Sequence, residues 1–163
     1  MEPSAVGLLV TGTGCASRVI GIGELRERSR IRLDVEYVTR RRHERHEVHG
    51  VHLYDVLREG PLPVDTRHKM ASLTVVVLAV AEDGFQVALS LAELDPEFGA
   101  CAALLATRYN GELLARPTLV MPSDQRASRY VRGLARLQLM CVGGDPVRNG
   151  VRGSGPDRVS GGR

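Results

Sequence analysis

The sequence predicts a mixed α+β domain built from many short strands and a few short helices. Residues 31–38 alternate apolar and charged side chains, which is the period of a strand with one buried face. Residues 72–81 form a largely apolar segment rich in β-branched side chains, which indicates a central strand buried on both faces. Asn110-Gly111 lies between the apolar segments 102–109 and 117–121, and it predicts a hairpin because both central positions of a type I′ turn need positive φ. Many strands with few helices favour the α+β class.

The other expected elements are shorter. Ser90 with Glu93 three residues later matches the capping box that begins a helix, and Pro96 ends it. The Glu82-Asp83-Gly84 segment predicts a turn between two antiparallel strands. We further expect strands over 5–12, 85–89 and 134–141, helical turns over 19–28 and 52–57, a charged insert over 39–49 and a loop over 60–69.

Length and composition indicate one globular domain followed by a tail. The chain has 163 residues, of which 43% are hydrophobic and 25% are charged, with a formal net charge of +3. Residues 1–141 are expected to form the domain. Residues 142–163 are rich in Gly, Pro, Ser and Arg and cannot bury enough apolar area to fold, so they are expected to be a disordered basic tail.

Several classes of function are disfavoured by composition. Three cysteines at irregular spacing do not form a disulfide framework or a zinc motif. No apolar segment approaches the roughly 20 residues that span a bilayer, and no basic segment precedes an apolar one at the start, so we expect a cytoplasmic protein that does not bind a membrane. Aromatic residues are too scarce to provide bases with stacking partners, so nucleic acid is not an expected partner. The sequence does not indicate an oligomeric state.

The segment 39–52 has the most unusual local composition. It combines four arginines with histidines at every third position, namely His43, His46, His49 and His52. Three interpretations remain open: a metal site, a solvated charged loop, or a loop that faces an anion or cofactor. On a strand only histidines six residues apart share a face, which argues against a metal site. Clustered Arg and His suit phosphate oxygens, so Arg42 and His46 are candidate cofactor-binding residues.

A second basic cluster comprises Arg126, Arg129, Arg132 and Arg136. Arg129 and Arg132 are three residues apart, so one helical turn would place both on the same side. They are candidate cofactor-binding residues, and the alternative is a solvated arginine face.

Catalytic motifs are few. The sequence contains no G-x-S-x-G elbow and no P-loop. Asp83 and His46 are the candidate groups for proton transfer, although Asp83 also suits its turn through local hydrogen bonds. Cys101 precedes an apolar strand and is interpreted as a buried small residue more than as a nucleophile.

Six short blocks follow one another in a fixed order along the chain. The blocks are Gly50-Val51-His52-Leu53-Tyr54-Asp55-Val56-Leu57, Asp83-Gly84-Phe85, Leu89-Ser90-Leu91-Ala92-Glu93-Leu94, Asn110-Gly111-Glu112-Leu113-Leu114, Leu119-Val120-Met121-Pro122 and Ser128-Arg129-Tyr130-Val131-Arg132-Gly133-Leu134. In this order and spacing they resemble the molybdopterin-binding domain of sulfite oxidase-like oxidoreductases. The similarity covers about residues 6–140, and the chain looks most like short, stand-alone bacterial members of actinobacterial type that lack haem and dimerisation domains.

This resemblance implies a fold of bent, mostly antiparallel sheets and a pocket that holds molybdopterin. By position, Arg129 and Arg132 match the basic positions of the family's S-x-x-V-K-type block. His46 and the arginines before it, Arg42 among them, fall in the loop after the metal-ligating position.

The chain departs from the family at the metal-ligating position, and the family's Gly-x-Pro-x-Arg pattern also lacks its arginine over residues 115–119. The family's active members hold molybdenum through a cysteine thiolate about a dozen residues before the first block, and Val38 occupies that position here. An alkyl side chain cannot donate to a metal, so no metal ligand is assigned. The leading hypothesis is an oxidoreductase-like domain without the usual molybdenum coordination. The alternatives are a cofactor-free binder of a small anionic or polycyclic ligand, a cyclase- or isomerase-type enzyme using His46 or Asp83, and a partner-binding module that uses the tail.

Overall fold

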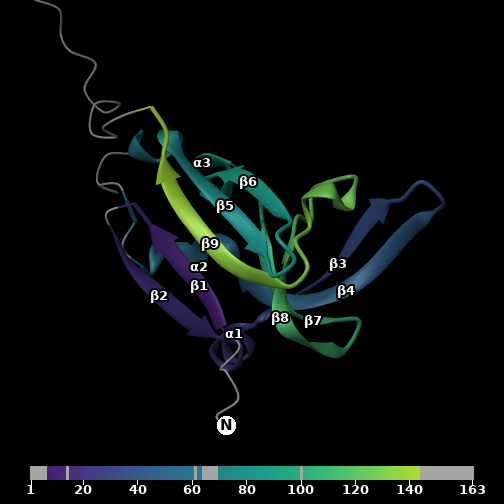
Figure 1. The fold of residues 1–163 in the computed structure, drawn as a ribbon. Helices are drawn as coiled ribbons and strands as arrows, with labels where there is room; N and C mark the ends of the chain where they lie inside the picture. The colour runs from purple at the N-terminus through teal and green to yellow at the C-terminus, as the bar shows by residue number, and fades with distance from the viewer. Residues whose placement is uncertain (1–6, 14, 61, 64–69, 100, 144–163) are drawn as a thin grey trace, which may run out of the picture.

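A five-stranded sheet forms one layer of this computed structural model, which describes residues 7–13, 15–60, 62–63, 70–99 and 101–143 (Figure 1). The strand order is β2-β1-β9-β5-β6, and every pairing is antiparallel except that of β1 with β9. The strands of this sheet are β1 (Gly7–Gly12), β2 (Cys15–Gly21), β5 (Val75–Ala81), β6 (Gln86–Ser90) and β9 (Leu134–Cys141).

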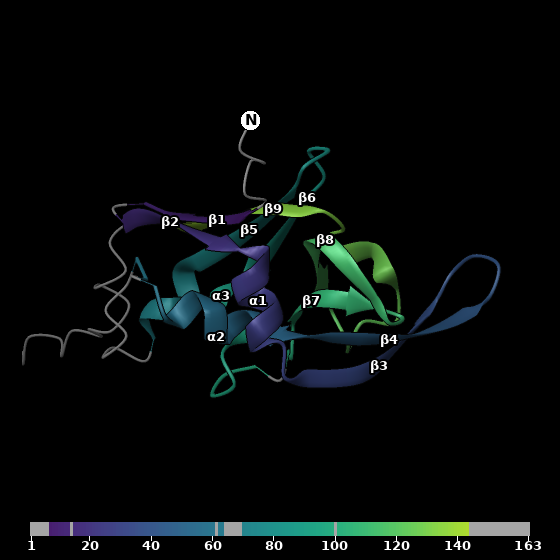
Figure 2. The same ribbon diagram turned by 90° about the horizontal axis from the view of Figure 1, so that it is seen from below.

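A four-stranded antiparallel sheet forms the second layer, in the order β3-β4-β7-β8. The far end of its β3–β4 hairpin projects beyond the rest of the molecule, as Figures 1 and 2 both show. The strands of this sheet are β3 (Ile31–Val38), β4 (His43–His52), β7 (Leu104–Tyr109) and β8 (Glu112–Val120).

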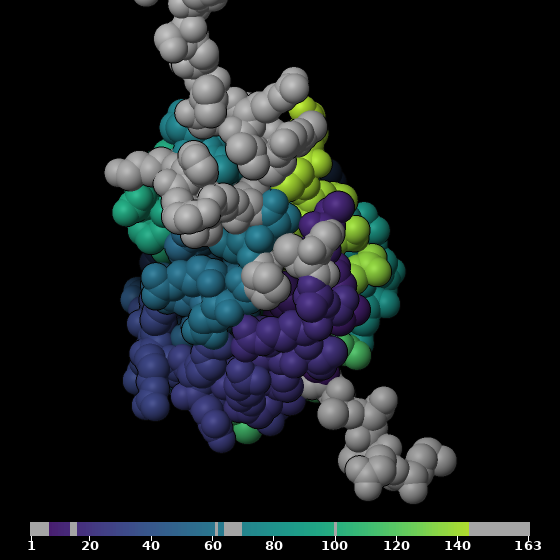
Figure 3. Space-filling model, turned by 90° about the vertical axis from the view of Figure 1, so that its left-hand side faces the viewer, coloured from purple at the N-terminus to yellow at the C-terminus, as the bar shows by residue number. Residues whose placement is uncertain are grey.

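Short helices connect the two sheets. In Figure 2, α1, α2 and α3 lie on the side of the five-stranded sheet that faces the four-stranded one, and α1 contacts strands of both. On the face shown in Figure 3, the described residues of β1, β2 and α1 (purple) adjoin α2, and Arg28 at the end of α1 forms a 2.6 Å ion pair with Glu59 at the end of α2. The helices are α1 (Ile22–Arg28), α2 (Leu53–Arg58) and α3 (Leu91–Leu94), with 3-10 turns η1 (Ala71–Thr74) and η2 (Ala127–Arg129).

The core lies between these layers and consists mainly of aliphatic side chains, as expected for a chain with no tryptophan. Each sheet contributes one apolar face, so burial of apolar area drives the packing of the layers. The largest fully buried side chains are those of Leu8, Ile20, Leu25, Leu53, Leu89, Leu91, Leu104, Leu105, Leu119, Met121, Leu134 and Leu137.

Most of the expected elements are confirmed. β3 has the predicted bounds and alternation, with Val35 and Tyr37 buried and their neighbours exposed. The capping box of α3 is present, with the Glu93 carboxylate accepting the Ser90 amide at 3.2 Å. Asn110 and Gly111 have the positive φ values of 47° and 82° that the type I′ turn needs. The α+β class follows from these elements.

Two expectations about local structure are wrong. The charged insert expected over 39–49 is instead a strand from His43, because its charges pair across the hairpin: Arg32 with Glu47, and Arg45 with Asp34. Residues 19–21, expected to open a helix, end strand β2, so α1 begins only at Ile22.

Gly50 explains how β4 approaches its neighbour so closely. A Cβ atom there would lie 2.2 Å from the carbonyl oxygen of Leu105, so only glycine fits against β7. The strand register shifts between His49 and Gly50 at this point. Most of the loop expected over 60–69, the first two residues of the strand expected over 5–12, and most of the tail expected over 142–163 lie outside the described residues.

Candidate functional site

Two cavities meet at Arg132, and together we call them the arginine cleft. The larger has a volume of about 710 Å³ and the smaller about 300 Å³. The larger is lined by Glu82, Tyr109, Asn110, Glu112, Leu114, Ala115, Arg116, Thr118, Arg132 and Gly133. The smaller is lined by Asp83, Phe85, Ala127, Tyr130 and Arg132.

The backbone around Arg132 is fixed from both sides. Val131 and Leu119 exchange two backbone hydrogen bonds of 2.9 and 3.0 Å, which attach this segment to β8. The Glu82 amide donates to the Gly133 carbonyl at 2.9 Å, which attaches it to the β5–β6 turn. Arg132 is thus brought beside Asp83, about fifty residues earlier in the sequence.

Charges in the cleft are unevenly compensated. The Arg116 guanidinium donates to the Glu82 carboxylate at 2.7 Å, so these two charges offset each other. Arg132 is exposed and forms no ion pair or hydrogen bond with any residue that the structure describes. Asp83 accepts the Phe85 amide at 3.0 Å through one oxygen, which leaves its carboxylate accessible to further donors. The cleft therefore combines an available cation with an available acceptor.

Aromatic rings form the wall behind the cleft. The ring centroids of Tyr37 and Tyr130 lie 5.4 Å apart, edge to face, and His46 lies 5.5 Å from Tyr37 and 5.1 Å from Tyr109. Burial, reinforced by the Tyr37 hydroxyl, raises the pKa of Tyr109 above its ordinary value. Burial also raises the pKa of Tyr130 to about 12, so both phenols stay neutral and can donate hydrogen bonds.

The hydroxyl group of Tyr130 has no hydrogen-bond partner among the described residues, and we call it the orphan hydroxyl. Tyr130 is only 7% exposed, and its Oη atom is buried. A buried hydroxyl without a partner is costly, and such groups commonly mark a position where a water or a ligand completes the network.

His46 is partly buried, and both of its ring nitrogens form hydrogen bonds. Asn110 accepts the Glu47 amide through Oδ1, which orients its Nδ2 to donate to His46 Nδ1 at 2.8 Å. The proton of the ring therefore resides on Nε2, which donates to Glu44 at 2.9 Å. His46 does not line the cleft, but Asn110 connects it to the larger cavity. This arrangement suits a role for His46 in positioning Asn110 at the larger cavity.

The other predicted residues are widely separated. Arg42 is exposed at the end of the β3–β4 hairpin, where its Nε donates to Glu44 at 3.1 Å. Arg129 donates to both carboxylate oxygens of Asp124 at 2.8 Å and lies 3.4 Å from Glu93. The helical turn expected to align Arg129 with Arg132 is absent, because η2 ends at Arg129 and the chain continues extended to its bridge with β8. Of the five predicted site residues, only Asp83 and Arg132 line the cleft.

The position that the resemblance assigns to the metal-ligating thiolate lies outside the arginine cleft. Val38 shares the solvent-facing side of β3 with Glu36, is 45% exposed and lines neither part of the cleft. Cys101 lies in a different cavity near the opposite end of β4, and the Cys141 thiol is directed at the Pro63 carbonyl, 3.6 Å away. Among the residues the structure describes, no group of three His, Cys, Asp or Glu side chains is arranged to hold a metal ion.

The structure adds Tyr109, Asn110, Phe85 and Tyr130 to the predicted site. Two sequence signals could have indicated them. Asn110 and Phe85 adjoin the two predicted turns, and Tyr109 and Tyr130 are half of the tyrosines in a chain poor in aromatics.

No helix in the described part of the chain is long and apolar enough to cross a bilayer. In comparisons with known proteins, neither a family model nor a curated sequence matches this chain.

Proposed function

We propose that this domain binds a small, planar, anionic heterocycle in the arginine cleft and does not carry out thiolate-ligated molybdenum chemistry. The observation that carries the proposal is the Arg132 guanidinium, which has no ion-pair partner among the described residues and lies between two cavities, with the Asp83 carboxylate in one of them. A guanidinium can bind a carboxylate or phosphate in bidentate fashion. Asp83 can accept hydrogen bonds from ring N–H or amino groups of the same ligand.

The aromatic lining supports a flat ligand. Phe85 is 47% exposed at the smaller cavity, and Tyr130 forms another part of its wall. A ring placed between them would bury apolar area and bring polar atoms close to the orphan hydroxyl of Tyr130. A pterin bearing an acidic group has these properties, which agrees with the resemblance to molybdopterin-binding domains.

A cyclase- or isomerase-type enzyme is the second candidate, and the position of Asp83 favours it. Its carboxylate shares the smaller cavity with a cation that would bind an anionic substrate, and a base must lie within reach of the proton that it removes. Under this alternative, Asp83→Asn would abolish turnover and leave the affinity for the substrate largely intact. Under simple binding, the same change would weaken affinity and reveal no lost activity.

An NMR titration tests where the ligand binds. Pterin-6-carboxylate should shift the backbone amides of residues 83–85 and 130–133, whereas uncharged pterin should cause smaller shifts at the same positions. Shifts confined to other parts of the domain would reject the cleft. Equal shifts with both probes would reject the role of the anionic group.

The Val38→Cys variant tests the metal half of the proposal. When it is produced in a molybdenum-replete host, we expect no stoichiometric molybdenum by elemental analysis, because the side chain faces solvent outside the cleft. Stoichiometric molybdenum in this variant would show that the pocket is built for the metal and lacks only the thiolate.

A further inference from the structure

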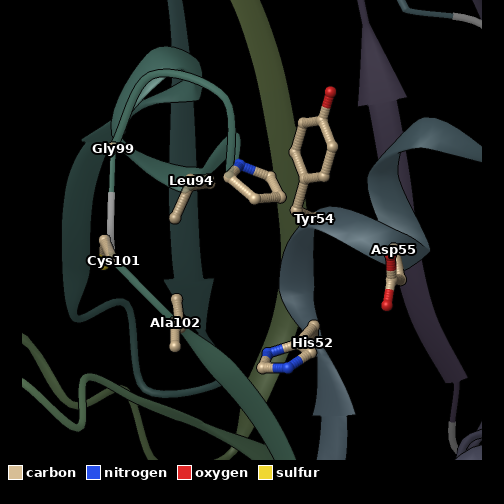
Figure 4. Close-up of a pocket in the computed structure, with 9 residues that line it drawn as sticks. His52, Tyr54, Asp55, Leu94, Gly99, Cys101 and Ala102 are labelled. Atoms are coloured by element: carbon tan, nitrogen blue, oxygen red, sulfur yellow. The ribbon is translucent and has the colours of Figure 1, made fainter.

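A separate cavity lies at the junction of β4 and α2, and we call it the His52 cavity. It has a volume of about 350 Å³ and shares no residue with the arginine cleft. Figure 4 shows His52 and Tyr54 on one side and Leu94, Cys101 and Ala102 on the other. Its full lining is His52, Tyr54, Asp55, Leu94, Pro96, Gly99, Cys101, Ala102 and Ala103.

Hydrogen bonds fix the walls of this cavity before any ligand arrives. The Leu53 amide donates to the Ala103 carbonyl at 2.9 Å, which joins the start of α2 to the segment before β7. The Tyr54 hydroxyl donates to Asp95 at 3.0 Å, which joins α2 to the loop after α3. A Cβ on Gly99 would lie 2.4 Å from the Glu93 carbonyl oxygen, so this loop closes tightly on α3. A preformed cavity costs a ligand little ordering of the protein.

The carboxylates around the cavity are already engaged. Asp55 pairs with Arg58 at 3.3 Å, so its charge is already compensated. Asp95 accepts from both the Tyr54 hydroxyl and the Glu97 amide. Among the described lining residues there is no Lys or Arg and no carboxylate without a partner, so the wall does not favour a charged ligand.

His52 supplies the polar group that remains. It is partly buried and forms no hydrogen bond or ion pair with the residues that the structure describes. Cys101 is half-buried opposite it, and burial raises the pKa of its thiol, which therefore stays neutral. The rest of the surface comes from Leu94, Pro96 and alanine side chains, which are apolar.

We propose that the His52 cavity is a second binding site, for an uncharged, ring-shaped ligand with one group that hydrogen-bonds to the His52 imidazole. An apolar cavity of about 150 Å³ accepts benzene. The His52 cavity, at about 350 Å³, has room for a bicyclic ring. Apolar walls with a single directional polar group are typical of small-molecule sites, in which that group fixes the orientation of the ligand.

Indole is a suitable probe because it is bicyclic, uncharged and carries one N–H donor. In an NMR titration, indole should shift the amides of residues 52–55 and 101–103. Indole-3-carboxylate, which has the same ring with a charge, should bind at least tenfold more weakly. The His52→Phe variant should keep the shape of the wall and weaken indole about fivefold or more, the cost of losing one hydrogen bond.

Two controls separate the possible outcomes. Arg132→Ala should leave indole binding unchanged, so the proposal for the His52 cavity is tested independently of the proposal for the arginine cleft. Because a cavity variant could fold poorly, labelling of the wild-type thiols by N-ethylmaleimide provides a second readout. Indole should slow the labelling of Cys101 and leave that of Cys141 unchanged. Absence of shifts and of protection up to about 1 mM indole, or tighter binding of the carboxylate, would overturn the proposal.

Discussion

The guanidinium of Arg129 is held by Asp124 through two hydrogen bonds of 2.8 Å, one to each carboxylate oxygen. The Asp124 contact is the main reason that the pKa of Arg129 is raised, and Glu93 contributes to the same shift. Because Glu93 also closes the capping box of α3, this arginine joins the segment before β9 to that helix. Its charge is therefore committed to the fold and is not available to a ligand.

Arg129→Ala should consequently lower the free energy of unfolding by about 1 kcal/mol, a modest figure because the pair is partly exposed. Affinity for pterin-6-carboxylate should change less than about twofold, equivalent to roughly 0.4 kcal/mol. Urea unfolding and calorimetric titration measure the two effects. A large loss of affinity with unchanged stability would place Arg129 in the binding site instead.

The orphan hydroxyl of Tyr130 leads to a prediction with the opposite pattern. Tyr130→Phe removes a buried group that has no partner, so stability should stay the same or rise by up to about 1 kcal/mol. Affinity for the pterin probe should fall if the hydroxyl completes its network with the ligand. Tyr37→Phe is the matched control, since its hydroxyl interacts with Tyr109 and Glu44, and it should lower stability. A destabilised Tyr130→Phe variant would show that the hydroxyl has a partner in the free protein.

Stability at acid pH should depend on Glu44. Hydrogen bonds from His46 first, and then from Arg42, lower the pKa of this carboxyl from 4.5 to about 2. A lowered folded-state pKa stabilises the fold fully above 4.5, and this contribution is lost as the pH falls through about 2. Glu44→Gln should therefore lose less stability than the wild type between those pH values in urea unfolding. Glu27→Gln, at an exposed side chain with no ion pair to a described residue, should retain the wild-type profile.

Gly50 provides a test of the close approach between β4 and β7. Gly50→Ala should lower the free energy of unfolding by about 2 kcal/mol or more, because its Cβ would collide with the Leu105 carbonyl. Gly23→Ala is the matched control. No atom lies within 4 Å of a Cβ at Gly23, and alanine favours the helix there, so this variant should be up to about 1 kcal/mol more stable. Equal effects at both positions would contradict the packing described here.

Local patterns predicted the fold well where a strand has a clear apolar pattern on one or both faces. The alternation that includes Val35 and Tyr37 predicted the correct bounds of β3. The apolar segment 72–81 contains all of β5, although its first three residues belong to the 3-10 turn η1. β4 was missed because its charged residues pair across the hairpin, and no local pattern shows which partners a charge will find. β2 was missed because Cys15–Gly21 has neither alternation nor a continuous apolar segment.

The site was predicted less completely, since it depends on contacts between distant elements. Asp83 and Arg132 were each singled out, but their juxtaposition requires the β5–β6 turn to pack beside the start of β9. Arg129 was grouped with Arg132 from their spacing and from the resemblance of the block that contains them. That spacing loses its meaning where the helical turn ends and the chain becomes extended.

The central claim is that Arg132 binds the anionic group of a planar ligand, and calorimetric titration of pterin-6-carboxylate tests it most directly. Arg132→Ala should weaken binding about tenfold or more, equivalent to roughly 1.4 kcal/mol, without lowering stability. Arg40→Ala removes the same charge from an exposed position outside the cleft and should leave the affinity unchanged. Equal affinities for the wild type and the Arg132→Ala variant, or equal losses in the two variants, would contradict the account.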